Sequence, residues 1–365
     1  MIEFKKAVAR EILDRDGQIT SLYLDIDHPI KKAINYNQLT GPVEVGDILL
    51  VNTTAGTLGL GTGGVHFVMA NLSGAEKELI PGGHGMKLKY TPIQSKLLLS
   101  EEAGSPYHSL FNEEIDFNKK VVYVGELHSM LPPLCAYLKY MSKGSLRIAY
   151  IMTDHGALPL CFSRNVLDLK KKNLLDITVT TGNAFGGDFE CVNIYTALKA
   201  ALNIGKCDIA ILSMGPGILG TNTRYGFSGL ELGLYVNLIH HLGGNCIYIP
   251  RIGFGDSRIR HRGISHHSLT VLRDIIDHPT FLIFPLMPKE KAMRIIEQLR
   301  QEGLFPRNPL LFYSGYGIQK AMEYYQVSST TMGRSIKEDP FFFYELGAVG
   351  RYGLKLLDRM GKRMV

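Results

Sequence analysis

Residues 208–214, Asp-Ile-Ala-Ile-Leu-Ser-Met, form an apolar run of strand length, and the glycine-rich stretch Gly-Pro-Gly-Ile-Leu-Gly-Thr-Asn-Thr follows at 215–223. A short apolar run bounded by turn residues is typical of a strand that is buried on both faces. The same rhythm recurs from residue 119 onward, where β-branched runs alternate with stretches long enough for a helix. That alternation predicts parallel strands joined by helical crossovers.

The expected elements of this C-terminal part alternate between strand and helix. They predict an α/β domain over residues 116–365 with a Rossmann-like, doubly wound, mostly parallel sheet. Ser228 and Glu231 match the capping-box pattern at the start of one helix. Residues 326–365 carry an aromatic run at 341–344 and a basic tail, and we assign them no element. The predicted strands are 121–124, 146–152, 176–180, 208–214, 245–250, 280–284 and 309–313, and the predicted helices lie near 132–142, 157–171, 189–204, 228–242, 267–276, 288–302 and 316–325.

The N-terminal part has a different pattern, in which short β-prone runs are interrupted by glycine. Residues 21–26 alternate polar and apolar side chains, and 47–52 and 65–70 are mostly apolar. Alternation with a period of two is the pattern of a half-buried strand. We therefore predict a small β-rich, barrel-like domain over residues 1–115.

The composition is that of a folded globular protein, with 45% apolar and 20% charged residues. A chain of 365 residues exceeds the usual size of one hydrophobic core, which favours two domains. Apolar runs stay well short of the roughly 18 residues of a membrane span, and the charged N-terminus lacks a signal-peptide pattern. The five cysteines form no CxxC pair. We expect a cytoplasmic protein without a membrane partner.

The charge is mildly basic, with a formal net value of +6. Its densest basic stretch, 258–262, is not interleaved with the aromatic side chains that stack on nucleic-acid bases. The charge therefore favours a small anionic metabolite as partner and disfavours nucleic acid.

Polar, glycine-rich sequences follow five of the predicted strands. In an open α/β sheet, ligands bind outside the carboxyl ends of the strands, where these loops converge. The convergence predicts a functional cleft at that edge of the sheet. The polar stretches are 126–129, 153–156, 181–188 with Asn183, 215–223, and 251–267.

Gly215, Gly217 and Gly220 match the G-x-G-x-x-G pattern directly after a strand. Backbone amides of this loop, with Thr221, would cradle a phosphate at a helix start. The acidic residue that a dinucleotide site wants some 20 positions on is lacking. Dinucleotide binding, binding of another anion, and a simple flexible turn all remain open.

The richest cluster of functional side chains lies between residues 251 and 267. Guanidinium groups bind phosphate or carboxylate with two parallel hydrogen bonds. His266 or His267 would act as general base, because imidazole titrates near neutral pH. The alternative is a solvated basic loop with one histidine at a helix start. The expected anion ligands here are Arg251, Arg258, His261 and Arg262, joined by Arg334 from the C-terminal segment.

Asp154 and Asp188 are the acidic candidates for the catalytic site, either to orient the catalytic histidine or to hold a metal. With Asp256, His128 and His155 they offer the carboxylate and imidazole ligands that divalent metals use. No local ligand spacing such as H-E-x-x-H supports a metal, so the metal is left unassigned. A divalent metal or a nucleotide remains open as cofactor.

Long, specific phrases occur along nearly the whole chain, at 59–66, 127–133, 181–188, 214–217, 260–270 and 331–334. Through these phrases the chain resembles a bacterial family known as a domain of unknown function. The resemblance implies no activity, and it carries over no catalytic residue.

Three functions remain under consideration. The leading one is an enzyme that acts on a small anionic, phosphate-bearing metabolite at the carboxyl edge of the α/β sheet. The second is a non-catalytic module that senses a nucleotide or metabolite through the same cleft. The third is an oligomeric scaffold, a homo-oligomer with the aromatic run 341–344 in its interface.

Overall fold

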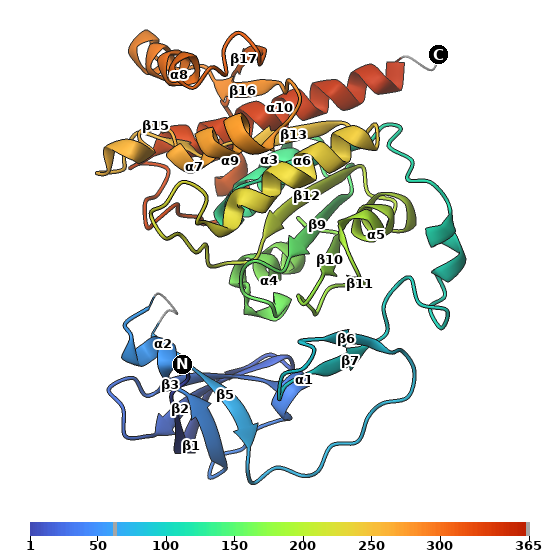
Figure 1. The fold of residues 1–365 in the computed structure, drawn as a ribbon, viewed down its shortest axis with the longest axis vertical. Coiled ribbons are helices and arrows are strands. Elements are labelled where there is room, and N and C mark those ends of the chain that lie inside the picture. Colours follow the sequence, from blue (N-terminus) through green and yellow to red (C-terminus); the bar gives the residue numbers. More distant parts are fainter. Residues whose placement is uncertain (61–63, 363–365) are drawn as a thin grey trace. The chain divides into compact units, whose positions relative to one another are not determined.

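The computed structural model describes residues 1–60 and 64–362, so the centre of the glycine-rich stretch 59–64 lies outside the described residues. The chain divides into two compact units, Met1–Lys96 and Leu97–Val365 (Figure 1). Segment 97–115, which the sequence assigns to the barrel-like part, bonds to the second unit. There the Ser100 N–H donates to the Glu190 carbonyl at 2.8 Å.

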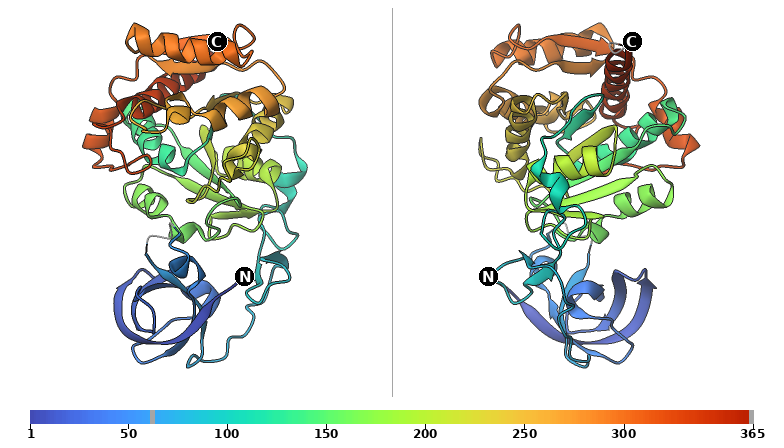
Figure 2. Two further views of the ribbon diagram at one scale, coloured as in Figure 1. Left: turned by 60° about the vertical axis from the view of Figure 1, so that its left-hand side comes forward. Right: turned by 90° about the vertical axis from the view of Figure 1, so that its right-hand side faces the viewer.

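The first unit is built around a closed barrel of five strands in the order β1-β2-β3-β5-β4 (Figure 2). Leu22 and Leu24 point into its core while Tyr23 between them is exposed, as the alternation predicts. The expected β-rich barrel is confirmed. The elements are β1 (Phe4–Arg15), β2 (Ile19–Asp25), β3 (Lys32–Tyr36), α1 (Asn37–Thr40), β4 (Ile48–Asn52), α2 (Thr54–Thr57), β5 (His66–Asn71), β6 (Gly85–Lys87) and β7 (Ser95–Leu97).

The second unit contains a six-stranded parallel sheet in the order β11-β10-β9-β12-β8-β13. Its four inner strands are almost entirely buried, which explains their continuous apolar sequences. The strands are β8 (Val121–Gly125), β9 (Ile148–Thr153), β10 (Ile177–Thr181), β11 (Phe189–Cys191), β12 (Ile209–Met214) and β13 (Cys246–Ile249).

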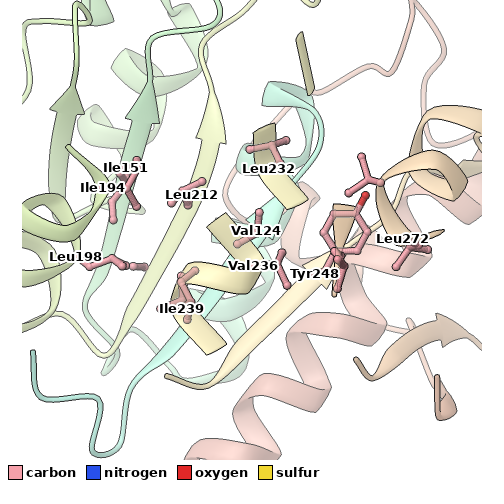
Figure 3. Packing of buried hydrophobic residues seen from close by; sticks show 14 of the residues in the cluster. Val124, Ile151, Ile194, Leu198, Leu212, Leu232, Val236, Ile239, Tyr248 and Leu272 are labelled. Carbon is pink, nitrogen blue, oxygen red and sulfur yellow. The ribbon is translucent and has the colours of Figure 1, made fainter. Parts of the chain in front are cut away.

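Side chains that alternate along each strand fill two separate cores, one on each face of the sheet. Val124 and Leu212 belong to one core, in which Val236 and Ile239 of a covering helix pack over the sheet (Figure 3). Tyr123 and Ile211 belong to the other. Helices therefore cover both faces. The first core takes in α5 (Ile194–Lys199), α6 (Glu231–His241), α7 (His266–Thr270) and α8 (Lys289–Gln301), and the second α3 (Leu131–Met141), α4 (Arg164–Lys171), α9 (Ile318–Tyr324) and α10 (Pro340–Lys362).

The last two predicted strands do not join the main sheet. β16 (Leu282–Pro285) and β17 (Leu310–Tyr313) pair in parallel with each other in a two-stranded sheet of their own. The segment to which the sequence assigned no element forms α10, which packs against β16 and α3, and β16 also touches the edge strand β13 without joining its sheet. The small antiparallel pair β14 (Ile252–Gly253) and β15 (Gly263–Ile264) lies in the loop after β13.

The strand order determines where loops that lead to opposite faces of the sheet lie next to each other. β12 lies between β8 and β9, whereas the dinucleotide-binding order keeps the first two strands of the sheet adjacent. The loops after β8 and β9 lead to α3 and α4 on one face, and the loop after β12 leads to α6 on the other. Ligands of open α/β sheets bind where such loops part, which directs attention to the carboxyl ends of β8, β12 and β9.

Within the described part of the chain, none of the helices is both long enough and apolar enough to cross a membrane.

Candidate functional site

A cavity of about 220 Å³ opens at the carboxyl ends of β8 and β13. Glu126, which follows β8, and Gly220 and Asn222 of the loop after β12 line it. Most of its remaining wall comes from the segment after β13 that the sequence singled out. These residues are Arg251, Arg258, Arg260, His261, His266 and His267.

Asp256 is the structural centre of the arginine cluster. Its carboxylate is 3% exposed and accepts from Arg258 Nε at 3.0 Å and from Arg251 Nη2 at 3.2 Å. Arg334 reaches the same carboxylate from the C-terminal segment, also at 3.2 Å. Hydrogen bonds from Arg258, and then from Arg251, hold the pKa of Asp256 well below its usual range. Asp256 therefore stays ionised and fixes the guanidinium groups in place.

His261 is held in one tautomer by its neighbours. Its Nδ1 lies 2.9 Å from Arg251 Nη1 and 3.1 Å from Ser265 Oγ. A guanidinium group only donates, so Nδ1 accepts and the proton of the neutral ring sits on Nε2. Burial and the charges of Arg251 and Arg258 lower the pKa of His261 to about 3. At neutral pH His261 is therefore an uncharged donor.

His266 and His267 complete a cluster of three imidazole rings. The centroids of the His266 and His267 rings are 4.0 Å apart, and the His261 and His266 centroids are 4.8 Å apart. The His267 ring stacks on Phe227 at 4.1 Å. Burial lowers the pKa of His267 to about 4 and also lowers the pKa of His266. The cluster is neutral at pH 7, so its rings have lone pairs that can accept a proton, and the charge of a bound anion would raise their pKa values toward the neutral range in which a general base is effective.

Glu126 is the one carboxyl group among the described residues that line the cavity, and although it lies in the polar stretch 126–129 it was not among the predicted site residues. Its Oε2 accepts from Ser268 Oγ at 2.7 Å, and its Oε1 hydrogen-bonds to the Tyr248 hydroxyl. The Ser268 hydroxyl in turn accepts the Arg251 N–H at 2.9 Å. Burial raises the pKa of Glu126. The position of Glu126 directly after a buried strand was the signal that could have identified it.

A second polar cluster lies at the carboxyl ends of β9 and β12. His155 Nδ1 is 2.7 Å from Glu231 Oε2 and 3.5 Å from Asp154 Oδ1. One ligand atom from each of these residues lies within 4.8 Å of the other two, so the trio could hold a divalent cation. The predicted capping box is wrong, because Glu231 instead accepts from Thr153 Oγ1 at 2.9 Å.

The loop after β12 does not present its three glycines as a phosphate cradle. A Cβ on Gly156 would lie 2.4 Å from the Gly215 carbonyl oxygen, so Gly215 serves the close approach of two loops. Thr221 Oγ1 bonds within the loop, to the Gly226 carbonyl at 3.0 Å. Gly217 has a φ of +102° and does not line the cavity. Of the three glycines only Gly220 lines the cavity, together with Ile218 of the same stretch.

The same contact gives a test of how the loops are joined. Gly156→Ala is expected to lower the free energy of unfolding by about 1–3 kcal/mol, because the added methyl group clashes with backbone rather than with a movable side chain. The Ala157 N–H, which donates to the Pro216 carbonyl at 2.9 Å, would have to move. Urea unfolding measures the change. The control is Gly361→Ala in α10, where a Cβ meets no atom within 4 Å. An equal effect in both variants would contradict the contact.

The other predicted site residues lie outside the cavity wall. Asp188 binds Lys170 Nζ at 2.7 Å and the Thr178 N–H at 2.8 Å. Asn183 donates its N–H to Asp154 at 3.1 Å. Arg262 donates to the Asp256 carbonyl at 2.6 Å, so its side chain stabilises the loop after β13.

A scan against protein-family models matched residues 32–350 of the chain to the family described as "Protein of unknown function (DUF3866)". The chain belongs to this family. The description of the DUF3866 family assigns no activity. Searches of curated proteins and of solved structures found no match.

The DUF3866 match spans both clusters at the carboxyl edge of the sheet. The sequence located the basic segment but not its partners, namely Glu126 from far along the chain and Tyr248 and Ser268 directly beside the segment. Tyr248 and Ser268 lie in a strand and a helix that read as core. The sequence predicted Glu231 to be part of a helix cap, and no local pattern identified it as a member of the cluster with Asp154 and His155.

Proposed function

We propose that the cavity binds a small anionic metabolite, foremost one that bears a phosphate group, and that it is the active site of an enzyme. The observation that carries the proposal is the cavity wall itself. Three guanidinium groups and three imidazole rings line it, against one carboxyl group. Arginine provides paired donors for phosphate, and a neutral imidazole provides a donor without a counter-charge.

The arrangement of donors supports this choice. Arg251 and Arg258 are already oriented by Asp256, so little side-chain freedom is lost when an anion binds. The His261 ring is held with its donor on Nε2. Arg260 bonds to Asn222 across the cavity, which links the basic segment to the loop after β12.

The size of the cavity favours a small metabolite over a dinucleotide. Its volume of about 220 Å³ is below the roughly 300–1,000 Å³ of pockets that enclose drug-sized ligands. A Rossmann-like mode of binding at the carboxyl ends of the strands remains part of the proposal, without the dinucleotide.

In the proposed reaction His266 or His267 accepts the proton. Both line the cavity, and both have lowered pKa values because they are buried beside arginines. Asp154 would act through the cluster with His155 and Glu231, as a ligand of a divalent cation, and we leave Asp188 out of the site. Free cysteines, four of them buried, support a reducing, cytoplasmic setting.

A non-catalytic sensor of the same class of ligand is the second candidate, since the cavity geometry serves binding alone equally well. A metabolite recovered chemically unchanged after long incubation would favour it. The scaffold hypothesis loses its motivation, because Phe342 and Phe343 of the aromatic run are fully buried within the unit.

The test of the anion site uses Arg260→Ala. The exposed Arg260 side chain lines the cavity, so its removal leaves the Asp256 cluster intact. A charge-assisted hydrogen bond contributes about 1.5–3 kcal/mol, so phosphate should bind roughly 10- to 100-fold more weakly. Isothermal titration calorimetry with inorganic phosphate measures the loss. The matched control is Arg359→Ala, an exposed arginine of α10 that does not line the cavity. Equal affinity in both variants would contradict the proposal.

A further inference from the structure

A second carboxyl group lies behind the cavity. Glu345 of α10 is fully buried, with 0% of its surface exposed. No hydrogen bond of good geometry reaches either of its carboxyl oxygens within the described chain, although the nearby Ile252 backbone N–H favours its charged form. An ionised carboxylate without a partner is very costly in such a place, and the group neutralises instead. Glu345 is therefore expected to hold a proton.

Glu345 lies near Glu126, the carboxyl group in the cavity wall, because α10 packs on β8, which leads into Glu126, and on β13, whose Tyr248 hydroxyl bonds to Glu126. Burial, and next the charge of Glu126, raises the pKa of Glu345 well above its usual range. The two carboxyl groups thus interact, and one negative charge disfavours a second.

Glu126 has the surroundings of the ionised partner. The Ser268 hydroxyl accepts an N–H from Arg251, which leaves its own proton to donate to Glu126 Oε2 at 2.7 Å. The Tyr248 hydroxyl bonds to the other oxygen, and the Arg251 guanidinium favours the charged form. Among the described residues Glu345 has no comparable side-chain partner, and only the Ile252 backbone N–H favours its charged form.

We propose that the pair Glu126 and Glu345 holds one proton, on Glu345, while the cavity is empty, and that Glu126 takes up a second from solvent when an oxyanion binds. Glu126 is then the residue that exchanges this proton with the bound metabolite. The second half rests on the proposed function of the cavity. It follows because Glu126 lines the space that the anion fills, and two negative charges at close range in a partly buried site repel by several kcal/mol.

Other titratable and charged groups lie next to Glu126 and Glu345 and could contribute to proton uptake. Glu126 is faced by Tyr248, Arg251, Ser268 and Glu345, and Glu345 by Glu126 and Tyr248. Arg251 stays charged beside Asp256, and burial raises the pKa of Tyr248 well above its usual range. The charge of a bound anion would also favour protonation of the imidazole rings in the cavity wall. The experiment must therefore separate carboxyl from imidazole.

Infrared spectroscopy makes that separation, because only a protonated carboxyl group has the carbonyl stretch of an acid. At pH 8 the full-length protein should show this band, and Glu345→Gln should lack it. Glu345→Met, of similar length, provides the same test should the amide disturb folding. Glu126→Gln should keep the band. If the acid band persisted in both Glu345 variants, the assignment of the proton to Glu345 would be overturned.

Sulfate tests the second proton, because it does not itself titrate in this pH range. Saturating sulfate should add a second acid band to the wild-type spectrum and none to Glu126→Gln. Calorimetry should show that sulfate affinity rises up to about tenfold per unit fall in pH from this proton, with a shallower rise in Glu126→Gln. The same variant should bind sulfate several-fold more tightly at pH 8.

The outcomes distinguish the two proposals. Sulfate that binds without a new acid band overturns the proton exchange and leaves the anion site standing. Failure of both sulfate and phosphate to bind overturns the anion site and the second proton together. The band lost in the Glu345 variants still decides, on its own, whether the empty site holds one proton.

Discussion

Replacing Asp256 with asparagine is expected to lower the free energy of unfolding by about 3–5 kcal/mol, the usual effect of removing one partner from a buried ion pair. The neutral amide would leave Arg251, Arg258 and Arg334 without the carboxylate that they share. Arg251 suffers most, since its side chain is only 9% exposed. The loss should also release the guanidinium groups that line the cavity and abolish phosphate binding.

Urea unfolding at pH 7 measures the change, and Asp168→Asn is the matched control. Asp168 pairs with Lys172 one helical turn away and its side chain is 48% exposed, so its loss should cost no more than about 1 kcal/mol. If the Asp256 variant were no less stable than this control, the carboxylate could not be what orders the basic segment.

Acidification is expected to destabilise the protein between pH 6.5 and 4, and His128 should account for a large share. Its Nε2 lies 2.6 Å from Ser163 Oγ, which already accepts the Val166 N–H and therefore donates to the ring. Its Nδ1 lies 3.1 Å from the Tyr150 hydroxyl, which donates to the Met214 carbonyl. The ring must be neutral to fill both roles. Burial lowers its pKa to about 4.

The direction follows from proton binding in the two states. The unfolded chain protonates His128 near pH 6.5 whereas the folded chain does so near 4, so the unfolded state binds more protons within that window. At pH 5 the difference amounts to roughly 2 kcal/mol of lost stability relative to pH 7. Urea unfolding of wild type and His128→Gln at both pH values measures the part of the stability loss that is due to His128. The variant should lose that much less on acidification, and identical losses would refute the assignment.

Sequence patterns predicted the architecture because they are local. The alternation at 21–26 marks β2, and the apolar run at 208–214 marks β12. What they could not predict is which strands become neighbours. The run at 280–284 is as apolar as β12, yet it pairs with β17 in a separate sheet and packs against α10. That helix begins at Pro340, within a segment whose aromatic run has no simple helical period.

The candidate site was predicted in the same partial way. The segment 251–267 stands out by composition, and its arginines and histidines do line one cavity. Asp256 was considered as a metal ligand, but its contacts with arginines depend on chain folding that sequence does not show. Glu345 lies in an apolar helix far along the chain, so only its burial reveals it.

The order of the strands also bears on how the nascent chain matures. β8 pairs with β12 and β13 alone, and both leave the ribosome after it. A chain synthesised to residue 205 already contains β9, β10 and β11, which pair among themselves, while both edges of β8 are bare. Exposed edges of apolar strands invite pairing with other chains. Both edges of β8 therefore stay unpaired during translation until residues 209–249 have emerged. A chaperone that shields a single apolar strand would act in this interval.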